Sequence, residues 1–273
     1  MQSEKEFLEE LNVYKNEVLL ALKYLYTELA IHEIAHKDKK ILKTLNYSPT
    51  FWNTTLSALQ QSTFLTLGRI FDIGSKHSIH KLYKLSEQNK YLFTKKSFRE
   101  RWERNEDRTK INTWLESYLK TVYVPTDADF RKFKKTIKKL KNTYENIYRP
   151  IRDHFGHKIY VKNEEVKVLF DKVQIKELEK FCVTLENLHE VLWQLFHNGR
   201  GPMALSSHKK HSTQNILKNL YKQDYPGTSN TQIIREVRCV LNLLKTGQRT
   251  TEEERHEELN SMDSRHSFLN SAL

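Results

Sequence analysis

The sequence is poor in the residues that make turns. It has only 7 glycines and 5 prolines among 273 residues. Sheets, barrels and phosphate-cradling loops need turn residues at many positions, so this scarcity argues against all three. It favours long helices joined by few turns.

Cysteines and long apolar runs are also scarce. Cys182 and Cys239 are the two cysteines and fall within helical apolar patterns, so we expect small hydrophobic side chains in a reducing cytoplasm. No apolar run approaches the roughly 20 residues that a membrane span requires. The amino terminus, MQSEKEFLEEL, is acidic and amphipathic, unlike a secretory signal. The sequence therefore predicts a cytoplasmic protein with no membrane partner.

Positive charge is in excess. The chain has 46 Lys and Arg against 34 Asp and Glu, a net charge of +12. Much of the excess lies in residues 131–141, RKFKKTIKKLK, and in residues 95–110. Clustered cations suit a polyanion, most commonly RNA or DNA. The alternative is a set of solvated helix faces in a lysine-rich protein, and composition does not decide between them.

Four segments carry apolar residues at helical spacing. They run from Phe7 to Leu29, from Trp52 to Ile70, from Phe130 to Ile151 and from Ile175 to Leu195. Stripes of this kind bury against one another, so the sequence predicts an all-α fold, an up-and-down helical bundle.

The predicted bundle occupies residues 1–198. Within it, the charged segment 73–125 has a poorer pattern but is also expected to be helical. From residue 199 the composition turns polar. We expect residues 199–273 to form a helical extension, with short helices over 215–221 and 231–245 and a mobile charged tail.

One motif suggests zinc. Residues 32–36 read HEIAH, and two histidines four apart on a helix can bind one metal ion. Zinc proteases also need a strand-rich lobe and a third ligand, and this sequence offers neither. We therefore interpret His32 and His36 as polar residues near a helix end and expect no metal site.

A second segment, YRPIRDHFGHKIY over residues 148–160, is dense in chemically active side chains. Arg149, Asp153 and His157 are spaced four apart and would share one helix ridge, where Asp153 could orient His157. Arginine binds phosphate with two N–H groups, and histidine changes protonation near neutral pH. Together they supply what metal-free cleavage of an RNA backbone needs. The alternative is an arginine–aspartate–histidine ladder on a solvated helix end.

The order of features resembles the HEPN superfamily, in particular the branch of U-type abortive-infection proteins. Over residues 51–72, FWNTTLSALQQSTFLTLGRIFD holds Arg69 and Asp72 in an Arg-x-x-Asp-like signature, which we interpret as a structural ion pair. A later R-D-x-x-x-H motif, in IRDHFGHK, holds Arg152, Asp153 and His157. A helix resembling IKELEKFCVTLENLHEVLWQLF follows. The resemblance covers roughly residues 5–198.

This resemblance implies a metal-independent endoribonuclease of toxin or antiphage type, with its site at the interface of a homodimer and with no cofactor. His157 would be the general acid or base, Arg152 the phosphate clamp and Asp153 the residue that orients the histidine. An antitoxin or regulatory partner is expected. The alternative is a catalytically silent HEPN module that binds RNA or protein.

Cationic and polar side chains near the motif are expected to bind the RNA substrate. They are Arg149, His154, Lys158, Lys134, Lys135, Lys138 and Lys139.

Overall fold

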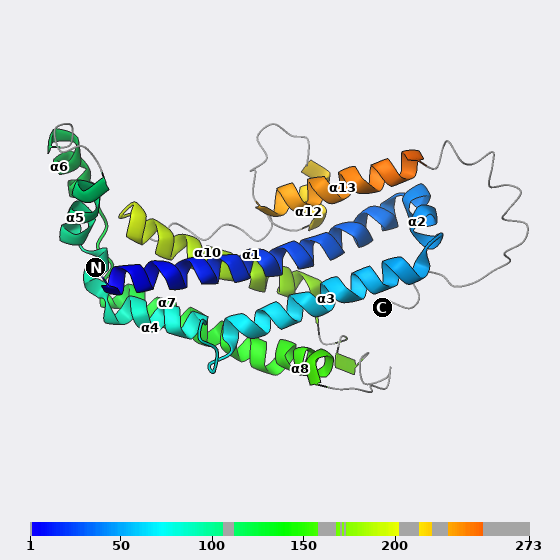
Figure 1. The fold of residues 1–273 in the computed structure, drawn as a ribbon, viewed down its shortest axis with the longest axis horizontal. Coiled ribbons are helices and arrows are strands. Elements are labelled where there is room, and N and C mark those ends of the chain that lie inside the picture. The colour runs from blue at the N-terminus through cyan, green and yellow to red at the C-terminus, as the bar shows by residue number, and fades with distance from the viewer. Residues whose placement is uncertain are drawn as a thin grey trace, which may run out of the picture. The chain divides into compact units, whose positions relative to one another are not determined.

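The structure is a computed structural model, and Figure 1 shows its helices. It describes residues 2–105, 112–157, 168–169, 171, 173–201, 213–219 and 229–247. These residues form helices and connections and contain no strand, which confirms the predicted all-α fold. No helix among them is long and apolar enough to cross a membrane.

The chain divides into two compact units. Unit 1 comprises Met1–Leu19, Thr66–Pro150 and Lys180–Ser206. Unit 2 comprises Leu20–Leu65, Ile151–Glu179 and Ser207–Leu273. The units are discontinuous because the long helices α1 (Gln2–Lys37), α3 (Pro49–Phe71) and α10 (Ile175–His197) contribute to both. The predicted boundary at residue 198 stays a prediction.

The remaining elements are shorter. The first half of the chain adds α2 (Lys39–Asn46), α4 (Ile79–Gln88), the 3-10 turn η1 (Lys90–Phe93), α5 (Lys95–Asn105) and α6 (Asn112–Thr121). The second half adds α7 (Asp127–Thr143), the π-helical turn η2 (Tyr144–Tyr148), α8 (Arg149–His157), α12 (Thr213–Asn219) and α13 (Ser229–Gly247).

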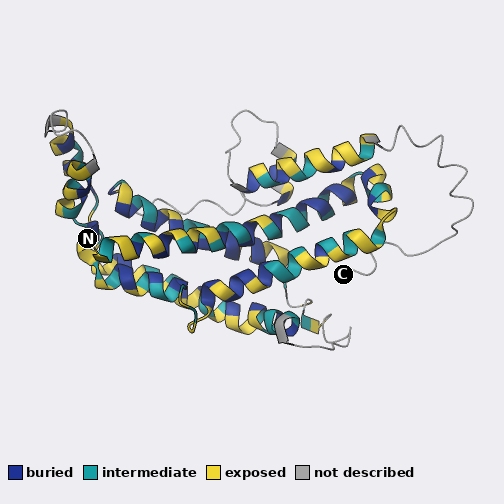
Figure 2. Ribbon diagram, viewed as in Figure 1, coloured by how far each residue is buried: buried dark blue, intermediate teal, exposed yellow. Residues whose placement is uncertain are grey.

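Aromatic rings fill the core of unit 1. The Phe7 ring lies 5.5 Å from that of Phe93 and 5.2 Å from that of Phe196, between ring centroids. Phe71 and Tyr144 stack at 5.0 Å. Figure 2 shows buried residues as stripes along the helices, as the predicted spacing requires.

In unit 2, α13 packs against α2. Asp38 caps α2 by accepting hydrogen bonds from the backbone N–H groups of Lys40 and Ile41. Its other carboxylate oxygen pairs with Lys245 of α13 at 2.6 Å. Cys239 of α13 is exposed, so the expectation of a packed thiol is wrong there, whereas Cys182 is buried as predicted.

The third predicted helix contains a π-helical turn. The Arg149 N–H bonds to the Tyr144 carbonyl, five residues back, just before Pro150. Proline has no N–H to continue the α-helical ladder, and a π turn is one way for a helix to absorb the lost bond. The extra residue shifts the buried stripe, so that Tyr148 is buried and Ile147 is only partly buried.

Candidate functional site

Helix α8 carries the R-D-x-x-x-H motif. It begins at Arg149 and its backbone ends at His157. The side chains of residues 149–155 are described, whereas the side chain of His157 lies outside the described part, as does Lys158. The motif residues therefore share one helix, as the sequence predicts, and the position of the imidazole stays a prediction.

Arg152 and Asp153 contact each other directly. The Arg152 Nε–H and Nη2–H groups both donate to Asp153 Oδ1, at 2.9 and 2.5 Å. Both side chains are partly exposed, at 20% and 39%. Because a guanidinium has five N–H donors, this pairing does not by itself prevent a contact with phosphate.

His154 and Arg149 differ in exposure. His154 lies in unit 2 with 4% of its surface exposed, and its ring packs edge-on against Phe155 at 5.8 Å. A contact between His154 and RNA would therefore require the histidine to become exposed. Arg149 lies in unit 1 and is exposed. Both substrate contacts stay predictions.

The four predicted lysines of α7 form an exposed cationic face of unit 1. Lys134, Lys135, Lys138 and Lys139 are all exposed. The opposite side of the helix is buried through Phe130, Ile137 and Leu140, which explains why the lysines face water. Within the described residues none of the four makes an ion pair. Their charge is therefore available to a polyanion.

Arg69 forms a structural ion pair, but with a different partner from the one predicted. Its Nε–H donates to Glu17 of α1 at 2.9 Å, and its Nη2–H donates to Thr66. Asp72 instead accepts a hydrogen bond from the Gly74 backbone N–H at the end of α3. Glu17 lies 52 residues before Arg69, so no local pattern could have identified this partner.

The HEIAH segment lies on α1 in unit 2. His36 is exposed and His32 is partly buried, which lowers the pKa of His32. Among the described residues, no group of three or more His, Cys, Asp or Glu side chains is placed to hold a metal ion.

One turn before His32 lies a carboxyl group that the sequence analysis missed. Burial raises the pKa of Glu28 to about 8, and its Oε1 accepts a hydrogen bond from Gln60 Nε2 at 3.4 Å. The sequence did contain one indication of this carboxyl group, because Glu28 lies among the apolar residues of the first predicted helix.

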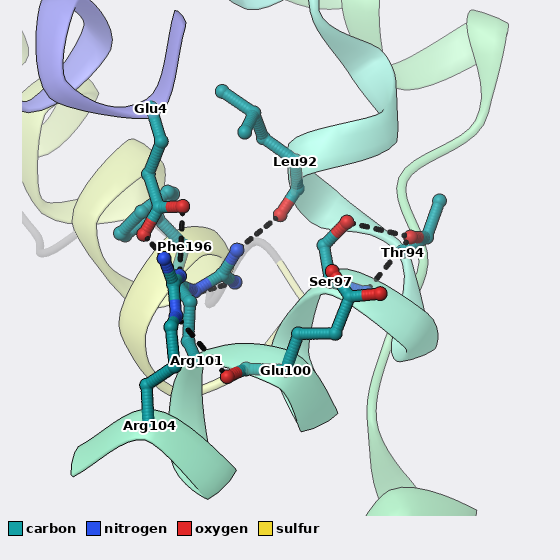
Figure 3. A network of polar contacts seen from close by, with 8 residues as sticks. All are labelled: Glu4, Leu92, Thr94, Ser97, Glu100, Arg101, Arg104 and Phe196. Atoms are coloured by element: carbon teal, nitrogen blue, oxygen red, sulfur yellow. Dashed lines mark hydrogen bonds and ion pairs between the residues drawn. The ribbon is translucent and has the colours of Figure 1, made fainter. Parts of the chain in front are cut away.

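Arg101, a buried arginine of α5, was not predicted from the sequence either. Figure 3 shows its guanidinium between η1 and the end of α10. It donates to the carbonyl oxygens of Leu92 and Phe196, each at 2.8 Å. Arg104, one turn later, donates to both carboxylate oxygens of Glu4 on α1, at 2.9 and 2.8 Å. These hydrogen bonds hold α5 to η1, α10 and α1 within unit 1.

A family model described as AbiU2, of the HEPN type, matches residues 4–222 and so includes the R-D-x-x-x-H motif. The match also runs beyond residue 198. No curated protein and no solved structure matches the chain.

Proposed function

The chain belongs to the AbiU2 family of HEPN-type proteins, and from this membership we propose that it is a metal-independent endoribonuclease of the abortive-infection, antiphage type. The observation that supports the proposal is that Arg152, Asp153 and His157 of the motif lie on one helix, α8. A clamp for phosphate and a group that transfers protons thus occur within about two turns of one helix.

The proposed chemistry uses the ribose itself as nucleophile. The 2′-oxygen attacks the adjacent phosphorus while a base takes its proton, and the bond from phosphorus to the 5′-oxygen breaks as that oxygen receives a proton. His157 acts as the base or the acid, and Arg152 stabilises the extra negative charge on the phosphorane-like transition state. Asp153 holds the imidazole in one orientation.

This chemistry favours a homodimer. One copy of α8 supplies one motif histidine, His157, because its other histidine, His154, is buried. The reaction needs a proton acceptor and a proton donor at once. Two copies related by a two-fold axis would present both histidines and both arginines to one phosphate. We therefore propose that the active form is a homodimer with α8 at its interface.

Binding of RNA would depend mainly on charge. The exposed lysine face of α7 would hold the RNA backbone without sequence preference, with Arg149 and Lys158 as further phosphate contacts. His154 would join them only in a more open form of α8. An antitoxin or regulatory partner that covers these groups would keep the nuclease silent.

One observation favours a second function, a catalytically silent module that binds RNA. The Arg152 guanidinium already bonds to the neighbouring Asp153 carboxylate, which partly neutralises the proposed phosphate clamp. Under this alternative the Arg–Asp pair is structural, and the lysine face alone contacts the nucleic acid.

Cleavage of single-stranded RNA in EDTA separates the two functions. The nuclease proposal expects cleavage by the wild-type protein and its loss in His157→Ala, with unchanged sedimentation as a dimer. His36→Ala is the matched control, because it removes an exposed histidine from another helix. Binding without cleavage, equal in both variants and the wild type, would establish the silent module.

A further inference from the structure

Helices α5 and α6 enclose a small aromatic cluster in unit 1. Its buried members are Phe98, Leu115, Leu119 and Val122. The rings of Trp102 and Tyr118 pack against this core and are only partly buried. The pair of helices is thus held together by a core of mixed aliphatic and aromatic side chains.

Three of the rings form a stack that runs from the core to the surface. The Tyr118 ring lies 5.7 Å from Phe98 and 5.0 Å from Trp114, with interplanar angles of 21° and 22°. Phe98 is 1% exposed, whereas Trp114 is 51% exposed. The outer end of the stack is therefore a large indole that is half open to solvent.

The position of this stack is fixed. The Tyr118 hydroxyl donates to the Asn198 carbonyl oxygen at 2.9 Å, which holds the middle ring. The Trp102 ring supports the Trp114 ring from the side at 5.0 Å. Arg101 bonds α5 to the carbonyls of Leu92 and Phe196 (Figure 3). A platform fixed in advance loses little conformational entropy when a flat ligand adds to it.

Charge around the stack favours an anionic ligand. Of the six Lys and Arg side chains described on α5 and α6, Arg101 is buried and Arg99 and Arg104 pair with glutamates. The other three are exposed lysines: Lys95, Lys96 and Lys120. Lys95 lies on the α5 ridge that also carries Phe98 and Trp102. Only residues 122–126 separate α6 from α7 and its exposed lysines. A ligand that could both stack on the exposed Trp114 ring and bind the nearby cations would have flat rings along an anionic backbone.

We propose that Trp114 is a stacking platform for an unpaired base of single-stranded RNA, whose backbone continues along the lysine face of α7. The inference rests on the proposed function, in which RNA is the substrate. Duplex RNA keeps its bases stacked inside the helix, so the platform would select single-stranded segments. It would add affinity for bases to the charge attraction of the lysines.

The test measures binding of two oligomers of equal length, a short oligoadenylate and an abasic ribose-phosphate chain. All proteins carry His157→Ala so that the RNA stays intact. We expect Trp114→Ala to weaken binding of oligoadenylate about tenfold, within the range for one base–aromatic stack, and to leave binding of the abasic chain unchanged. Trp114→Phe should bind oligoadenylate nearly as the parent does, because it keeps a stacking ring.

Phe51→Ala is the matched control, since Phe51 of α3 is 61% exposed and lies outside the stack. It should bind both oligomers as the parent does. If Trp114→Ala retained full affinity for oligoadenylate, the platform would be excluded and the indole assigned to a protein contact. An equal loss for both oligomers would also overturn base stacking. Cleavage in EDTA by protein with His157 intact tests the nuclease separately, so either proposal can fail without the other.

Discussion

The guanidinium of Arg101 on α5 lies 4.0 Å from the ring centroid of Phe196 and donates a hydrogen bond to the Phe196 carbonyl oxygen. Phe196 belongs to the last turn of α10, where carbonyl groups lack partners within the helix and the dipole is negative. Burial lowers the pKa of Arg101 to about 10, so the group is still charged at neutral pH. Arg101 therefore caps α10 from another helix.

Arg101→Met is expected to destabilise the protein. The substitution keeps an apolar stem but leaves the buried carbonyls of Leu92 and Phe196 without their donor. We expect the free energy of unfolding to fall by about 1–3 kcal/mol, measured by urea denaturation. Arg104→Met is the control, because its pair with Glu4 is on the surface and such pairs contribute less than about 1 kcal/mol. Equal effects of the two substitutions would contradict the cap.

The contacts of Arg101 are also of a kind that the sequence alone does not predict. Apolar spacing predicted the long helices because burial of a stripe depends on neighbours three and four residues away. The partners of Arg101 lie 9 and 95 residues away, and that of Arg69 lies 52 residues away. The identity of such partners depends on tertiary packing, for which the sequence has no local pattern.

The candidate site, like the fold, could be predicted only where it depends on local sequence spacing. Arg152 and Asp153 lie on one helix, as the motif spacing predicts, and the lysines of the charge run on α7 are exposed, whereas their contact with RNA stays a prediction. The burial of His154 was not predicted, and the π turn before α8 sets which residue faces inward. Local spacing cannot specify that turn, because it depends on how the helix accommodates Pro150.

The stability of the protein should depend on pH through Glu28. Its pKa is about 8 in the folded chain against 4.5 for the unfolded residue, so the folded state binds the extra proton between these values. The free energy of unfolding should therefore fall as pH rises from about 4.5 to 8, by up to about 1.4 kcal/mol per pH unit.

Glu28→Gln tests this dependence, because it keeps a neutral polar side chain of the same length. Urea denaturation at several pH values should show a weaker decline for the variant, which becomes more stable than the wild type near pH 8 and similar to it near pH 5. Glu33→Gln is the control on the same helix, since Glu33 pairs with Lys37 near the surface. Parallel pH profiles for wild type and Glu28→Gln would contradict a partly buried, neutral carboxyl group.

The lysine face of α7 should determine how strongly RNA binding depends on salt. Each phosphate contact that is lost lowers the slope of log affinity against log salt by about 0.7 for a single strand. The double substitution Lys134→Gln with Lys138→Gln should therefore lower the slope by about 1.4 and weaken the binding of all RNA sequences alike. Anisotropy titrations at several salt concentrations measure both effects.

Lys39→Gln with Lys43→Gln is the matched control, because these exposed lysines of α2 have the same spacing. If both pairs changed the slope equally, net charge rather than the α7 face would attract the RNA. A changed slope for the α7 pair alone would place the backbone along α7, because only a local contact distinguishes two variants of identical charge.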